Sequence, residues 1–132
     1  MGDTLQISSA ALARMLEEAA ASADEVCGLL LGDPAEARAC RNVHAKPGRH
    51  FEIDPAALLR AHREARAGGA AVVGCYHSHP LGDATPSRTD AASAVPDGTV
   101  WVIVASGEAR AWRAVERGAV HGRFDPVEIA VV

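Results

Sequence analysis

Hydrophobic residues recur every three or four positions in two segments of the chain, which is the spacing of a helix with one buried face. The first segment is residues 10–21, and Ser8 and Ser9 before it are suitable N-caps. Its predicted buried face consists of Leu12, Met15, Leu16 and Ala19. A short strand over residues 4–7 is predicted to lead into this helix.

The second segment is residues 55–67, and both of its ends carry helix signals. Asp54 suits the N-cap, and Pro55 suits the first helical position, where an N–H would have no partner within the helix. Gly68 and Gly69 follow the last helical residue, as is common at helix C-termini. The sequence therefore predicts a second helix with defined ends.

Shorter apolar runs, bounded by glycine, proline and polar residues, predict strands elsewhere. These runs cover residues 25–32, 37–45, 70–76, 99–106, 109–116, 119–124 and 127–132. Short turns separate the last four. At 132 residues and 48% hydrophobic, the chain suits one core. We predict an α+β fold (mixed α and β) in a single domain, residues 1–132, with a curved, mostly antiparallel sheet flanked by helices.

Charge and hydropathy narrow the range of partners. The net charge is −4 and the basic residues are scattered, so no nucleic-acid-binding surface is indicated. No stretch approaches 18 apolar residues, and the charged N-terminal region does not resemble a signal peptide. We expect a cytoplasmic protein that binds neither nucleic acid nor membrane.

The three cysteines favour reduced thiols, because Cys27, Cys40 and Cys75 are an odd set without a Cys-x-x-Cys spacing. Cys75 shares the strand parity of His77 and His79, so it is a possible metal ligand or nucleophile. The simpler interpretation is a core residue, because free cysteine packs as a small hydrophobe.

Two imidazoles that can share a metal follow the apolar run 70–76. His77 and His79 stand at alternate positions near a strand end, where their side chains lie on one face of the sheet. Neutral imidazole is a common zinc ligand, although a lone His-x-His also occurs by chance in surface turns.

A third candidate ligand, Asp90, lies at the start of a predicted short helix that stops before Pro96. Ser87 fits the N-cap of this helix, and Asp90 follows three residues later. The pair alone could be no more than a capping box. Combined with the two histidines, however, it predicts a metal site with three protein ligands and one open position, which is typical of catalytic zinc.

An efficient metal-assisted hydrolase also needs a group that carries the proton, and Glu25 is the candidate. Strand alternation places it on the same side as Cys27, Leu29 and Leu31. A charged side chain at the start of an apolar strand suggests a functional role. The alternative is that Glu25 is simply exposed to solvent at the end of the strand. Of the other polar residues, Asp83 is interpreted as turn chemistry beside Gly82.

The remaining histidines have no motif spacing, and each is interpreted as a surface or edge residue. They are His44, His50, His62 and His121. His50 also lies in the loop before Phe51 and is a candidate for the lining of a substrate groove.

Together, Glu-x-x-Gly-x-Leu-x-Gly from Glu25, His-x-His-Pro from His77, and Ser-x-x-Asp from Ser87 resemble the JAMM (MPN, Mov34/PAD-1) metallopeptidase family over nearly the whole chain. The resemblance implies one zinc ion held by His77, His79 and Asp90. It also implies that Glu25 acts as general acid/base and that Ser87 stabilises the oxyanion. The implied fold is cytidine-deaminase-like.

The resemblance also suggests a substrate class. The chain is similar to the compact bacterial branch of the family and lacks the inserted loops of deubiquitinating members. That branch implies hydrolysis of an amide bond after the Gly-Gly tail of a ubiquitin-like sulfur-carrier protein. Glycine lets the backbone of such a tail approach a narrow metal cleft closely.

Two other functions remain open. A non-catalytic MPN module would bind a ubiquitin-like tail equally well without metal, whereas the enzyme would lose turnover on chelation. A small-molecule amide hydrolase would act on a free amino-acid conjugate that has no carrier attached.

Overall fold

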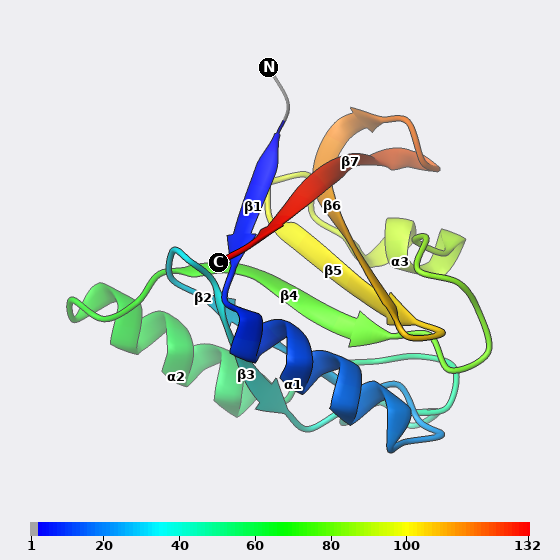
Figure 1. The fold of residues 1–132 in the computed structure, drawn as a ribbon, viewed down its shortest axis with the longest axis horizontal. Helices are drawn as coiled ribbons and strands as arrows, with labels where there is room; N and C mark the ends of the chain where they lie inside the picture. The colour runs from blue at the N-terminus through cyan, green and yellow to red at the C-terminus, as the bar shows by residue number, and fades with distance from the viewer. Residues whose placement is uncertain (1–2) are drawn as a thin grey trace.

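The computed structural model describes residues 3–132, which form one seven-stranded sheet with three helices (Figure 1). The strands are β1 Thr4–Ile7, β2 Cys27–Leu31, β3 Glu36–Cys40, β4 Val72–Ser78, β5 Val100–Ala105, β6 Glu108–Gly118 and β7 Gly122–Val131. The helices are α1 Ser9–Ala20, α2 Pro55–Arg66 and α3 Arg88–Ser93. The sheet order is β1-β7-β6-β5-β4-β2-β3, with only the β1–β7 and β4–β5 pairs parallel. The predicted α+β fold with a mostly antiparallel sheet is confirmed.

The helices cover both faces of the sheet. Met15 of α1 is fully buried against one face, in a core that includes Tyr76 of β4. On the other face, Ala61 of α2 packs with Leu29, and α3 lies against a second core around Trp101. The site residues described below lie on the face that carries α2 and α3.

The helix boundaries follow the sequence signals. The Ser8 side chain accepts from the N–H of Ala11 at 3.0 Å, which caps α1. Asp54 caps α2 by accepting from the N–H of Ala56 at 3.1 Å, with Pro55 as the first helical residue. Both predicted helices are confirmed to within one residue at each end.

Three strand predictions are wrong in their limits. The strand predicted over 37–45 ends at Cys40, because the Asn42 side chain takes over the backbone groups of the following loop. The strands predicted over 119–124 and 127–132 are the single strand β7. Pro126 does not interrupt β7, because β1 pairs with this strand only from Glu128 on and so needs no N–H at position 126.

Strand parity in β4 is as predicted. Tyr76 points into the core beneath α1, whereas Cys75 packs on the opposite face with Trp101. His77 has the parity of Cys75 and is fully buried. Within the described residues, none of the helices is long and apolar enough to cross a membrane.

Candidate metal centre and catalytic site

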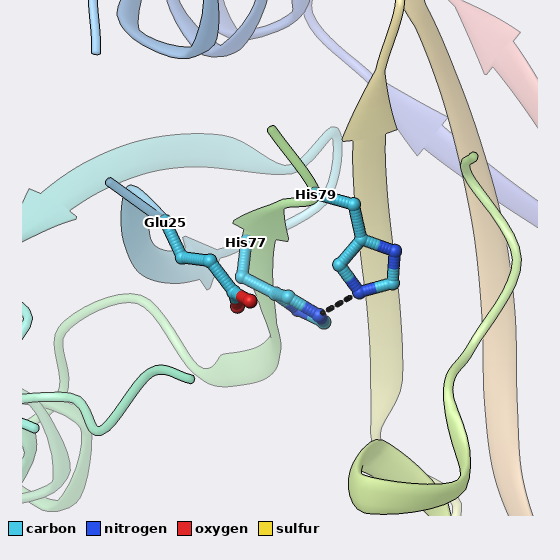
Figure 2. A group of neighbouring side chains, drawn as sticks. All are labelled: Glu25, His77 and His79. Carbon is cyan, nitrogen blue, oxygen red and sulfur yellow. Dashed lines mark hydrogen bonds between the residues drawn. The ribbon is translucent and has the colours of Figure 1, made fainter. Parts of the chain in front are cut away.

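The end of β4 brings two imidazole rings together. His77 is the penultimate residue of β4, and His79 follows directly after the strand. Their Nε2 atoms lie 3.1 Å apart, and Figure 2 shows the two rings pointing toward each other. The predicted histidine pair is therefore a pair in space.

Asp90 reaches the same point from the first turn of α3. Its Oδ2 lies 3.1 Å from Nε2 of His79, and its Oδ1 lies 3.2 Å from Nε2 of His77. The capping box is also present: Asp90 N–H donates to Ser87 Oγ at 3.0 Å, and Ser87 N–H donates to Asp90 Oδ2 at 2.9 Å. The capping interaction directs the carboxylate toward the histidines. Asp90 can therefore belong to a capping box and still be a candidate metal ligand.

The tautomer of His79 leaves a lone pair facing the other groups of the cluster. Nδ1 of His79 lies 2.8 Å from the carbonyl oxygen of Asp83, which can only accept, so Nδ1 carries the proton. In the neutral ring, Nε2 therefore presents a lone pair toward the Asp90 carboxylate and the ring of His77. A cation at this point would have a ligand atom from each of the three side chains, and two imidazole nitrogens with one carboxylate oxygen are a donor set that suits zinc.

Burial and charge shift the pKa values of these groups in opposite directions. Burial lowers the pKa of His77, although Asp90 opposes the shift. Burial also acts to lower the pKa of His79, but the hydrogen bond and charge of Asp90 raise it overall. The pKa of Asp90 lies well below its usual range because, against the effect of burial, both imidazoles stabilise the carboxylate.

Glu25 lies two residues before β2, and its side chain is directed toward the histidines (Figure 2). It is only 7% exposed, and one of its carboxylate oxygens lies within 4.8 Å of one ring nitrogen of His77 and one of His79. Burial raises its pKa to about 7; His79 counteracts the shift, and Asp90 adds to it. A carboxyl group that titrates near neutral pH can both take up and deliver a proton.

Aromatic side chains hold the ring of His77. Phe51 stacks on it with ring centroids 4.1 Å apart, and Trp101 meets it edge-on at 5.6 Å. Trp112 donates from Nε1 to the carbonyl oxygen of Ala84 at 2.9 Å, which ties the loop before α3 to the sheet. These aromatic contacts join segments far apart in the chain, so no spacing in the sequence indicates a site role for them.

A groove of about 550 Å³ lies beside this cluster, between the sheet and α2. Glu25, Ser87 and Asp90 line it, together with apolar side chains such as Leu58 of α2. His50 also lines the groove, as predicted, and so do His44 and His62.

The structure also places the other candidate residues of the sequence, Asp83, Cys75 and His121. Oδ1 of Asp83 accepts from the N–H of Thr85 at 3.1 Å, which confirms the turn interpretation. Cys75 packs in the core, and burial raises its pKa, which keeps the thiol protonated. His121 lies at an exposed turn, 3.1 Å from the carbonyl oxygen of Pro86.

A family model described as prokaryotic homologues of the JAB domain matches residues 8–115. The chain belongs to this JAB family. It is 34% identical over 121 residues to a desampylase from Pyrococcus furiosus, an alignment that covers 89% of this chain and 86% of that one. It is also 38% identical over 84 residues to a desampylase from Haloferax volcanii, over 60% of each chain.

A third relative, named a probable TtuB-protein conjugate cleaving protease from Thermus thermophilus, is 43% identical over 49 residues, which are 37% of this chain and 33% of that one. A solution structure from Desulfitobacterium hafniense has a TM-score of 0.78 at 25% identity, over 96% of this chain and 92% of that one. A JAB1/MPN domain protein from Archaeoglobus fulgidus shares the fold, with a TM-score of 0.58 at 23% identity, over 99% of this JAB chain and 100% of that one. The predicted JAMM/MPN family and the predicted class, a hydrolase, are confirmed.

Proposed function

We propose that this protein is a zinc-dependent isopeptidase that hydrolyses the amide bond after the Gly-Gly tail of a ubiquitin-like sulfur-carrier protein. The observation that supports it most is the convergence of His77, His79 and Asp90 beside Glu25, next to a groove that Glu25 and Asp90 line. The relatives named for desampylase activity and for cleaving TtuB-protein conjugates support the substrate class.

The side chains of His77, His79 and Asp90 would hold the zinc ion. Bound zinc supplies Lewis acidity, which polarises an amide carbonyl and makes water a stronger acid. Phe51 and Trp101 keep the ring of His77 in place, and the carbonyl oxygen of Asp83 fixes the tautomer of His79.

In this mechanism, Glu25 takes a proton from the attacking water and delivers it to the leaving amine nitrogen. Both steps need a carboxyl group that exchanges protons near neutral pH, as the burial of Glu25 provides. Ser87 lines the groove, and its Oγ already accepts from Asp90 N–H, so its own hydroxyl proton is available for the oxyanion.

The groove accounts for a tail-specific substrate. Its apolar lining, which includes Leu29, Ile53 and Leu58, suits an extended chain, and glycines next to the cleaved bond allow the backbone to reach the buried cluster.

We also propose a cytoplasmic location for the protein.

The direct test uses a ubiquitin-like protein whose Gly-Gly tail is joined by an amide bond to the lysine side chain of a fluorescent peptide. We expect the wild-type protein to release the peptide, to stop after chelation and dialysis, and to recover when one equivalent of zinc is added. Cleavage that survives complete metal removal would contradict the proposal, as would a zinc-loaded protein that binds the conjugate without cleaving it.

A further inference from the structure

The backbone of Glu25 lies outside the strand ladder that follows it. Strand β2 begins at Cys27, and the first residue whose main chain bonds to β4 is Val26, through Ser78. Glu25 N–H instead donates to the carbonyl oxygen of Pro47 at 2.7 Å. The backbone of the proposed acid/base is therefore held on one side by the sheet, through Val26, and on the other by the loop of residues 42–52.

The side-chain amide of Asn42 organises this loop. Its Nδ2 donates to the carbonyl oxygens of Glu25 and His50, both at 2.9 Å, and lies 3.4 Å from that of Pro47. Its Oδ1 accepts from the N–H groups of His44 and Glu52, both at 3.1 Å. One side chain therefore joins Glu25 to both ends of the loop.

The hydrogen bonds of Asn42 also hold the segment that carries Phe51. Phe51 lies between two of the peptide groups that Asn42 binds, the carbonyl of His50 and the N–H of Glu52. Its ring stacks on His77 at a centroid distance of 4.1 Å. Asn42 consequently connects the backbone of Glu25 with the side chain that supports a proposed metal ligand.

Only an amide satisfies these partners. The two N–H bonds of Nδ2 match the carbonyl oxygens of Glu25 and His50, whereas Oδ1 accepts from the N–H groups of His44 and Glu52. Aspartate in the same place would direct a carboxylate oxygen at the carbonyls. A smaller side chain would leave the N–H and carbonyl groups without their partner.

We propose that Asn42 is a positioning residue for hydrolysis, which acts by holding the backbone of Glu25 and the segment around Phe51 in register with His77. The inference rests on the proposed function, because it assigns to Asn42 the placement of the proposed acid/base. Misplacement of a reacting group by about 1 Å can reduce turnover about a hundredfold.

The test compares Asn42→Ala and Asn42→Asp with a matched control, Asp54→Ala. Asp54 follows this loop and caps α2. Its side-chain hydrogen bond is to the N–H of Ala56, so its loss should lower the stability of the fold without displacing Glu25. With the fluorescent Gly-Gly conjugate, both Asn42 variants should lose about tenfold to a hundredfold in kcat with less than a threefold change in KM. Zinc content should stay near one per chain, and Asp54→Ala should keep kcat within twofold.

Amide hydrogen exchange provides a readout that does not depend on activity. In Asn42→Ala, the amides of Glu25, His44 and Glu52 should exchange at least tenfold faster, whereas that of Leu30 in the β2 core should not change. This pattern distinguishes a loosened site from a generally destabilised fold.

Three results would overturn the inference while the wild-type protein remains active: a kcat within twofold of wild type in both Asn42 variants, an equal loss of kcat in Asp54→Ala, or failure of both Asn42 variants to fold. The last result would make Asn42 a folding residue. Wild-type protein that shows no zinc-dependent cleavage would instead refute the proposed function, so the two failures are distinguishable.

Discussion

Asp90 combines two roles in one carboxylate, since Oδ2 accepts from the N–H of Ser87 and also faces His79. A capping interaction is therefore not evidence against a metal ligand at this position. The helix start supplies the fixed orientation that a ligand needs.

At the same scale, loss of either buried ligand should remove the metal. His77→Ala and Asp90→Ala should each lose most of the zinc measured by elemental analysis, whereas His121→Ala, outside the cluster, should retain it. The fold should persist, because the large apolar cores do not depend on the metal. Full zinc retention in either ligand variant would remove that residue from the proposed set.

Ser87→Ala separates the cap from the chemistry. Loss of the hydrogen bond to the N–H of Asp90 should cost about 1 kcal/mol in the free energy of unfolding. Loss of one oxyanion donor should reduce kcat by roughly a hundred- to a thousandfold. Chemical denaturation and conjugate cleavage measure the two effects, and a lower stability with unchanged kcat would leave Ser87 only the capping role.

At the scale of elements, the loop before α3 is held by the indole of Trp112 on β6. Trp112→Phe keeps a ring in the core but leaves the carbonyl of Ala84 without its donor, and should cost about 1–3 kcal/mol in the free energy of unfolding. Urea denaturation with and without zinc tests this. A variant as stable as wild type would show that the hydrogen bond contributes nothing net.

The sequence predicted those elements whose signals are local. Asp54 with Pro55, and Ser87 with Asp90, mark helix starts through contacts within a few residues, so these boundaries match the structure. The strand predicted over 37–45 was too long, because its end depends on Asn42 contacts to Glu25 and His50. A single asparagine in an otherwise strand-like run was the one local signal available.

In the whole molecule, some features of the site follow from local sequence signals, whereas others depend on the complete fold. The strand parity of His77 and His79, the helix start that carries Asp90 and the charge of Glu25 before an apolar strand are local properties, and the family motif then implied a role for each. The stacking of Phe51 on His77 joins segments that only the complete fold brings together, so no spacing in the sequence could reveal it.

The stability of the metal-free protein should depend on pH through Glu25. Its pKa in the folded state, about 7, lies above the usual value of 4.5, so folding disfavours its ionisation. The stability that goes with its neutral form is full below pH 4.5 and is lost as the pH rises through 7. Glu25→Gln has no such group, so its melting temperature relative to metal-free wild type should rise between pH 5 and 8. A constant difference across this range would contradict the raised pKa.

Glu25→Gln separates proton transfer from metal binding, because we propose that Glu25 carries the proton while three other side chains hold the metal. The substitution keeps the shape of the side chain but removes its basic oxygen, so zinc content should stay near wild type. Cleavage of the Gly-Gly conjugate should fall by roughly a hundred- to ten-thousandfold, with binding of the conjugate retained. Cleavage at the wild-type rate would place the proton carrier elsewhere, and loss of zinc would make Glu25 a ligand; either result would contradict the mechanism.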